Sequence, residues 1–318
     1  MSIELKKSKI FIAGHQGMVG KAVLDYLKKK KLNNLIFLSK KKLNLQDKNK
    51  VNNFFKKNKP DIVINCAAKV GGINSNNNNK ISFLQDNLEI NQNIFRACHN
   101  FKVSKMIFLG SSCIYPKNIK ILIKEEDLLS SYLEETNEAY ALAKIVGIKL
   151  CDFYNKKFNT DYRAIMPCNL FGPNDKYDLE NSHALPALIK KIHLAKKRNE
   201  EYINIWGNGK PKREFLFVND LAEYIYKILL IKKKDFQKIS YKSFINIGSK
   251  YEYKIVDLVK IISKALHHPV KVKYIKKNLN GTIRKKLNDF RFRKIIKNKR
   301  QTPFIESIKT TYNDFLGG

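Results

Sequence analysis

Two pairs of side chains near the middle of the chain have the types and spacing needed to move protons. Ser111 and Cys113 follow the apolar run MIFLG, so a hydroxyl and a thiol lie where a buried strand should end. Tyr140 and Lys144 are four residues apart in EAYALAKIVG, which places them on one face of a helix. In a shared site, the Lys144 ammonium would lower the pKa of the Tyr140 phenol, and Tyr140 could then transfer a proton near neutral pH. Without such a site, this spacing is an ordinary feature of a helix surface.

A glycine-rich turn near the N-terminus predicts a dinucleotide site. The run KIFIAG leads into GHQGMVG, where Gly14, Gly17 and Gly20 recur every three residues and a helix begins at Met18. Glycines at these places allow a tight turn, a close approach of the backbone to a pyrophosphate and close packing of the helix on the sheet. The alternative is a tight turn without a ligand. Because the motif follows the first strand of an alternating series, we expect Gly14, Gly17, Met18 and Gly20 to bind a cofactor.

The end of the second predicted strand favours NADP(H) over NAD(H). An acidic residue there would bind the ribose diol, whereas a basic residue would accept a 2′-phosphate. The sequence is LIFLSKKKLNL, which has no carboxylate but offers Ser39 and Lys40. These two residues are therefore predicted to hold the phosphate, although lysines are abundant throughout the chain.

Alternating strands and helices must position these residues. The predicted strands are 9–14, 35–39, 61–68, 105–112 and 163–173, and the predicted helices are 18–31, 47–58, 81–100, 137–158 and 186–198. Parallel strands need crossover connections, and fully apolar strands are typical of a sheet covered on both faces. The expected fold class is α/β, a doubly wound parallel sheet of the NAD(P)-binding Rossmann type.

The second half of the chain has a different pattern of polar and apolar residues. A polar loop follows Pro173, and the basic C-terminal third has weaker periodicity. We expect an NADP-binding domain over 1–173, with returning elements at about 214–248. A smaller mixed α/β substrate-binding domain is expected over 174–213 and 249–318.

Composition bounds the class of protein. The chain has 318 residues, of which 43% are hydrophobic, so it can bury a substantial core. No stretch has the length of a membrane span and no leader peptide precedes the first strand, so we expect a cytoplasmic protein. The five cysteines are widely spaced without a CxxC pair, which argues against disulfides and structural zinc.

The formal net charge of +34 raises the possibility of a polyanion partner. The lysines are scattered over nearly every predicted helix, whereas a nucleic-acid site would combine arginines and exposed aromatic residues in one patch. We therefore favour solvated lysine-rich faces over nucleic-acid or membrane binding, with attraction of anionic substrates still expected.

The glycine turn, Ser111, and the Tyr140–Lys144 pair occur in the order that resembles the extended short-chain dehydrogenase/reductase superfamily. Longer segments, FIAGHQGMVG, AAKVGGI, FLGSSCIYP, ETNEAYALAKIVGIKLC, NSHALPALI and WGNGKPKREFLFVNDLA, are similar to the GDP-L-fucose synthase branch. The resemblance covers about residues 8 to 290. It implies NADPH-dependent 3,5-epimerisation and 4-reduction of GDP-4-keto-6-deoxy-D-mannose, without a metal.

The resemblance also assigns roles to individual residues. Cys113 and His183 match the epimerisation pair, with Cys113 as base and His183 as the opposing acid. Ser111, Tyr140 and Lys144 match the reductase trio, in which Lys144 also holds the cofactor ribose. An isolated cysteine or histidine is more often a packed or capping residue, so the assignments of Cys113 and His183 rest on the segment match.

Three basic residues match the family's substrate-binding positions. Arg213 and Lys285 correspond to cations near the diphosphate, and Lys191 stands where an arginine is usual. Three further departures, at Ile283, Asn288 and Gln16, put affinities in question more than the reaction. Trp206 is left unassigned.

Other functions remain open from the residues alone. The nearest is another nucleotide-sugar 4-epimerase or 4,6-dehydratase of the superfamily, which needs no thiol at position 113. A nonenzymatic NADP- or polyanion-binding protein is the alternative from a different class. The resemblance further implies a homodimer through helices 81–100 and 137–158, with Ile90, Ile94, Ile145 and Ile148 on their apolar faces.

Overall fold

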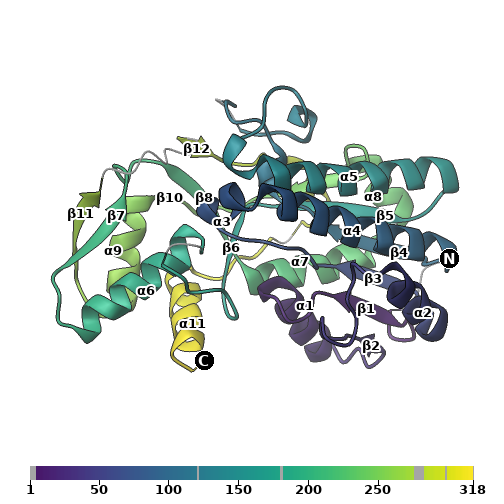
Figure 1. Ribbon diagram of the computed structural model, residues 1–318, viewed down its shortest axis with the longest axis horizontal. Helices are drawn as coiled ribbons and strands as arrows, with labels where there is room; N and C mark the ends of the chain where they lie inside the picture. Colours follow the sequence, from purple (N-terminus) through teal and green to yellow (C-terminus); the bar gives the residue numbers. More distant parts are fainter. Residues whose placement is uncertain (1–4, 120–121, 180–181, 276–282, 298, 318) are drawn as a thin grey trace.

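A six-stranded sheet forms the larger of two lobes in the computed structural model, which describes residues 5–119, 122–179, 182–275, 283–297 and 299–317 (Figure 1). Its neighbouring strands are all parallel. In spatial order they are β2 (Leu35–Ile36), β1 (Ile10–Ala13), β3 (Ile62–Asn65), β4 (Lys105–Leu109), β5 (Tyr162–Pro167) and β9 (Phe244–Ile247). The predicted doubly wound parallel sheet is confirmed.

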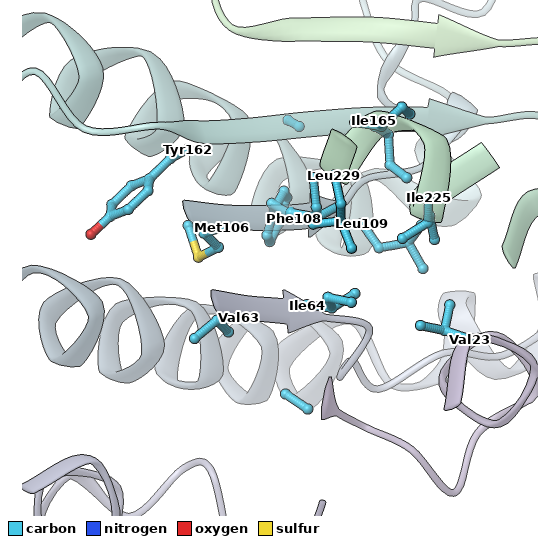
Figure 2. Packing of buried hydrophobic residues seen from close by; sticks show 14 of the residues in the cluster. Val23, Val63, Ile64, Met106, Phe108, Leu109, Tyr162, Ile165, Ile225 and Leu229 are labelled. Carbon is cyan, nitrogen blue, oxygen red and sulfur yellow. The ribbon is translucent and has the colours of Figure 1, made fainter. Parts of the chain in front are cut away.

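Helices cover both faces of this sheet, which explains why its strands are apolar throughout. α1 (Met18–Lys29) packs against α7 (Val218–Leu230), and α4 (Lys80–Asn100) packs against α5 (Glu138–Phe158) on the opposite side (Figure 1). Every residue of β1, β3, β4, β5 and β9 is buried. Figure 2 shows Leu109, Ile225 and Leu229 within the resulting core. Each such side chain contributes about 1.5–3 kcal/mol when fully buried.

The strand order places a ligand site at one edge of the sheet. β1 lies between β2 and β3, so the connections after β1 and after β3 run in opposite directions across the sheet. In open α/β sheets, ligands bind outside the carboxyl ends of the strands at such a reversal. The turns after β1, β3 and β4 are therefore the place to look for chemistry.

The smaller lobe is built from two short sheets and a second core. One sheet contains β10 (Glu252–Lys254), β8 (Lys212–Phe217), β12 (Arg284–Lys285) and β6 (Asn169–Phe171), and the other pairs β11 (Lys271–Ile275) with β7 (Tyr202–Trp206). Their apolar faces bury against α6 (Ala184–Lys197), α9 (Ile255–Ala265) and α11 (Phe304–Gly317). Figure 1 shows this lobe beside the carboxyl-end edge of the large sheet.

Most of the remaining helices are short and lie in the connections between larger elements, whereas α2 packs beside α4. They are α2 (Lys48–Asn58), α3 (Ile73–Asn78), α8 (Lys233–Ile239), α10 (Phe290–Ile295), η1 (Ser112–Ile114), η2 (Glu125–Asp127) and η3 (Glu135–Asn137). Across the described ranges, no helix combines the length and apolar character required to cross a bilayer.

Two predicted elements differ from the structure where the chain passes between lobes. The predicted strand 163–173 is divided at Cys168 into β5, in the large sheet, and β6, which pairs with β8. The segment near 215 was expected to return to the large sheet, but β8 runs in the smaller one, and only α7 and β9 return. An apolar run cannot reveal which sheet a strand joins, since both bury it.

The residues expected to mediate a homodimer lie largely inside the protomer. Ile94, Ile145 and Ile148 are buried in the large core, and Ile90 is half-buried beside it. The apolar side chains that α5 exposes are instead Leu142, Val146 and Phe153, among others. The expected use of the four isoleucines is therefore wrong, because they pack beneath the helix pair. The homodimer itself stays a prediction.

Candidate active site

A cavity of about 500 Å³ lies at the carboxyl ends of the large sheet. Its lining comes from the turns after β1, β3, β4 and β5 and from α5: 14–20, 66–70, 109–112, 167–170, Tyr140 and Lys144. His183, at the entry to α6, and Lys40, after β2, complete opposite parts of the wall. The structure thus brings the predicted glycine turn, Ser111, Tyr140, Lys144 and His183 to one cavity.

The glycine turn has the geometry of a dinucleotide cradle. Gly14 has a φ of +79°, and a Cβ there would lie 2.7 Å from the Cα of Ala67. A Cβ on Gly20 would lie 2.2 Å from the carbonyl oxygen of Gly14, so α1 can pack this closely only with glycine. At Gly17 the nearest protein atom would be 3.6 Å away. Space beside Gly17, which caps the amino end of α1, is therefore left open where a pyrophosphate would bind.

The predicted phosphate-binding residues after β2 are only partly in the cavity. Gln16, Met18 and Lys40 line it, whereas Ser39 is half-buried outside the lining and its carbonyl accepts hydrogen bonds from the amides of Lys42 and Leu43. β2 ends at Ile36, three residues before the predicted end, so the following residues turn away from the sheet toward the cavity. An exposed Lys40 can supply positive charge to an anionic group there.

The end of β4 positions a hydroxyl and a thiol together. Ser111 caps η1, and its Oγ accepts a hydrogen bond from the Cys113 amide at 3.4 Å. α5 lies close against β4 because Gly147 has no side chain: a Cβ there would be 2.1 Å from Cζ of Phe108. The Lys144 Nζ donates to the carbonyl of Leu109 at 2.7 Å. This approach brings Tyr140 and Lys144 to the strand end that carries Ser111.

The pKa of Tyr140 departs from the sequence-based expectation. Burial raises the pKa of the phenol well above its usual value, and the nearby Cys113 raises it further. Lys144 was expected to lower it, but the Lys144 ammonium points to the Leu109 carbonyl and lies 5.5 Å from the centre of the Tyr140 ring. The same burial lowers the pKa of Lys144 to about 8. A raised pKa favours the protonated phenol, the form that can donate.

Cys113 is half-buried, outside the cavity lining, and follows the end of β4 two residues after Ser111. Burial raises the pKa of its thiol, while Lys285, the Ser111 hydroxyl and Lys144 lower it. The thiol is thus surrounded by groups that favour the thiolate, although burial outweighs them. A base at this position depends on those neighbours for its activity.

His183 faces the cavity from the start of α6. The residue is exposed and lines the cavity, and desolvation by the surrounding protein atoms lowers the pKa of its imidazole. Lowering the pKa makes the neutral imidazole the resting form and its protonated form a stronger acid.

Two of the three predicted cations meet at the lobe junction. Lys285 of β12 is the direct register partner of Arg213 on β8, and Lys285 acts electrostatically on Cys113. Lys191 lies farther along α6, where its Nζ donates to the carbonyl of Asn204 at 2.8 Å and stands 5.3 Å from the Trp206 ring. The structure does not place Lys191 in the cavity lining.

The three residues that differ from the family pattern have different surroundings. Ile283 is 81% exposed, and Asn288 accepts a hydrogen bond from the amide of Phe290 through its side-chain oxygen. Neither residue lines the cavity, whereas Gln16 does. The effect of these substitutions on affinity stays a prediction.

Sequence reasoning missed an ion pair inside the cavity wall. Lys69 Nζ lies 2.8 Å from the Asp86 carboxylate, and both side chains line the cavity. Asn87 fixes the Lys69 backbone by accepting from its amide and donating to its carbonyl. The motif AAKVGGI marks this loop, but Asp86 lies 17 residues later on α4, and nothing in the sequence links the two.

The described residues fit a dinucleotide better than a metal. No group of three or more His, Cys, Asp or Glu side chains within the described part of the chain could hold a metal ion. The tight turn, the open space at Gly17 and the amino end of α1 together form a cradle for a pyrophosphate.

Comparison with known proteins agrees with this geometry. The model of the NAD dependent epimerase/dehydratase family matches residues 10–248. The GDP-L-fucose synthase of Escherichia coli strain K12 is 40% identical over 286 residues, which cover 89% of each chain. GDP-L-fucose synthase 1 of Arabidopsis thaliana is 41% identical, over 89% of this chain and 86% of that protein.

Among solved structures, a GDP-L-fucose synthetase from Naegleria fowleri bound to NADP superimposes with a TM-score of 0.87. It is 28% identical, and the match covers 98% of this chain and 94% of the other. The likeness extends over both lobes.

Proposed function

The chain belongs to the NAD dependent epimerase/dehydratase family, and we propose that it converts GDP-4-keto-6-deoxy-D-mannose to GDP-L-fucose with NADPH. The observation that carries the proposal is the position of Cys113. Its thiol stands beside Ser111, Tyr140, Lys144 and Lys285 at the end of β4. A reductase of a keto-sugar needs a hydroxyl, a phenol and an ammonium there, and the added thiol supplies a base for epimerisation.

Epimerisation requires removal of a proton from carbon next to the C4 ketone. In the proposed reaction, the Cys113 thiolate takes the proton from C3 while protonated His183 supplies a proton to the opposite face of the sugar. Cys113 then gives up its proton to water and His183 takes one up, and the same step is repeated at C5. Negative charge develops on the C4 oxygen, where the Ser111 hydroxyl and the Tyr140 phenol donate hydrogen bonds. Because burial keeps Tyr140 protonated, it enters this step as a donor.

Reduction then uses the same carbonyl. NADPH supplies a hydride to C4 when it is bound in the cradle formed by the glycine turn. Tyr140 gives its proton to the C4 oxygen, and Ser111 fixes the direction of that oxygen. Lys144, a buried residue of the cavity lining, stabilises the charge that remains on Tyr140.

The diphosphate of the substrate needs cations near the thiol. Arg213 and Lys285 are cross-strand partners at the junction of the lobes, so a diphosphate bound to them would direct its sugar toward Cys113. The planar Arg213 guanidinium suits two phosphate oxygens at once. Lys191, on α6, is proposed to act on the diphosphate only from a distance. Gln16 and Lys40 are proposed to lie nearest the phosphate of the cofactor.

Related reactions explain fewer of these residues. A nucleotide-sugar 4-epimerase or 4,6-dehydratase would use Ser111, Tyr140 and Lys144 but would leave Cys113 and His183 without a role. In a nonenzymatic dinucleotide-binding protein, none of these five residues would have a catalytic role.

A product assay tests the proposal. The purified protein is incubated with GDP-4-keto-6-deoxy-D-mannose and NADPH, and the sugar nucleotide is identified by chromatography and NMR. Formation of GDP-L-fucose with equimolar NADPH oxidation is expected. A product with an unchanged configuration at C3 and C5 would show that the protein catalyses only the 4-reduction. Release of unchanged substrate would refute the proposal.

A further inference from the structure

Glu134 is a buried carboxylate that the proposed reaction does not use. It is 8% exposed and immediately precedes η3, four residues before the helix that carries Tyr140. Its Oε1 lies 3.3 Å from Lys117 Nζ. Its Oε2 is fully buried and has no hydrogen-bond partner among the residues that the structure describes. A buried, half-satisfied carboxylate is costly, so its position calls for a compensating interaction.

Besides Lys117, two cations that interact with Glu134 lie on β8 and β12. Arg213 and Lys285 are direct partners across these parallel strands, an arrangement in which like charges repel. Burial lowers the pKa of both, and the Glu134 carboxylate opposes this by raising the pKa of each. Glu134 therefore balances a pair of cations that repel each other and are partly removed from water.

Lys285 connects this charge cluster to the thiol. The groups that act on Lys285 are Cys113, Arg213 and Glu134, and those that act on Cys113 are Lys285, Ser111 and Lys144. Tyr140 also interacts with Cys113. Lys285 interacts with both Glu134 and Cys113, so it is the group through which Glu134 can act on the thiol.

We propose that Glu134 is a positioning residue for the epimerisation step, whose carboxylate balances Arg213 and keeps Lys285 protonated beside the Cys113 thiol before substrate binds. The inference rests on the proposed function for its role in catalysis. A protonated Lys285 favours the thiolate, so the charge on Glu134 makes Cys113 a better base. Without that charge, burial and Arg213 would favour loss of the Lys285 proton, and the thiol would lose a cation that favours the thiolate.

The rate of Cys113 alkylation as a function of pH tests this role without substrate. Iodoacetamide reacts with the thiolate, and peptide mass spectrometry separates Cys113 from the other four cysteines. In Glu134→Gln, alkylation of Cys113 near pH 8 is expected to be about threefold slower or more, because the profile moves to higher pH. Glu134→Asp, which keeps the charge, should stay near the wild-type profile.

A neighbouring carboxylate provides the matched control. The Glu135 side chain is 84% exposed and stands 3.8 Å from Lys80, so Glu135→Gln should leave the profile unchanged. NADPH binding by each variant reports whether the glycine turn and α5 remain folded. If Glu134→Gln does not fold, the comparison of Glu134→Asp with wild type decides: a profile displaced to higher pH despite the retained charge would contradict the proposal.

A double-mutant comparison tests the path through Lys285. Lys285→Gln alone should slow alkylation in the same direction, and adding Glu134→Gln to it should change nothing further. An unchanged profile in Glu134→Gln, a displacement to lower pH, or a persistent effect of Glu134→Gln in the Lys285→Gln background would overturn the proposal. Turnover of the GDP-sugar by wild-type protein is scored separately, so failure of the proposed function cannot be mistaken for failure of this charge coupling.

Discussion

Lys144 reaches from α5 to the end of β4, where its Nζ donates a 2.7 Å hydrogen bond to the carbonyl of Leu109. Leu109 is the last residue of β4, two residues before Ser111. One buried ammonium therefore fixes the helix of Tyr140 to the strand of Ser111 and Cys113. It does so at an electrostatic cost, because burial lowers the pKa of Lys144 to about 8.

Stability should depend on pH through Lys144. The folded-state pKa of about 8 lies below the ordinary value of 10.5, so the unfolded chain binds this proton more tightly. The free energy of unfolding contributed by Lys144 should rise as pH increases from about 8 toward 10.5. In urea unfolding at several pH values, the free energy of unfolding of wild type minus that of Lys144→Met should increase across this range. A constant difference between the two proteins would contradict the lowered pKa.

The glycine turn offers a matched pair of substitutions. Gly17→Ala meets no atom closer than 3.6 Å, so it should fold normally but weaken NADPH binding about tenfold or more, since the methyl group occupies the phosphate space. Gly20→Ala places its Cβ 2.2 Å from the Gly14 carbonyl, so it should destabilise the protein by about 1–3 kcal/mol or more. Thermal unfolding and NADPH titration separate the two. Equal NADPH affinity in Gly17→Ala and wild type would place the pyrophosphate elsewhere.

Tyr140→Phe should separate the two halves of the reaction. Removing the phenol hydroxyl deletes the proton donor for C4, so NADPH oxidation should fall by about a hundredfold to ten-thousandfold. Exchange of the C3 and C5 protons with solvent should partly survive, because Cys113 and Ser111 remain. NADPH oxidation at the wild-type rate would show that another group donates the proton.

Arg213→Lys should weaken substrate binding more than turnover. Lysine keeps the charge but loses the planar pair of donors that suits a diphosphate, so the KM for the GDP-sugar should rise about tenfold with a smaller change in kcat. Arg198→Lys provides a control, since the Arg198 side chain is 65% exposed at the far end of α6. A fall in kcat at unchanged KM would instead connect Arg213 with the chemical step.

Much of this site could be predicted because its signals are local. Gly14, Gly17 and Gly20 share one turn, and Tyr140 and Lys144 share one helical face, so spacing alone places them. The strands of the large sheet are recognisable because parallel strands buried on both faces are continuously apolar.

What the sequence does not reveal depends on contacts between distant segments. The division of 163–173 into β5 and β6 depends on which sheet accepts each half. The pairing of Lys69 with Asp86 and the orientation of Lys144 toward Leu109 arise only when loops and helices meet. The pKa of Tyr140 was misjudged for the same reason, because burial outweighs the charge that spacing suggested.

In the proposed reaction, the Cys113 sulfur removes protons from the sugar. The most direct test is deuterium incorporation at C3 and C5 when wild type and Cys113→Ser are each incubated in heavy water with GDP-4-keto-6-deoxy-D-mannose and NADPH. Wild type should introduce deuterium at both carbons, whereas Cys113→Ser should do so at least about a hundredfold more slowly while NADPH binds with unchanged affinity. Wild-type incorporation by Cys113→Ser would show that another group is the base, and the account of this site would be wrong.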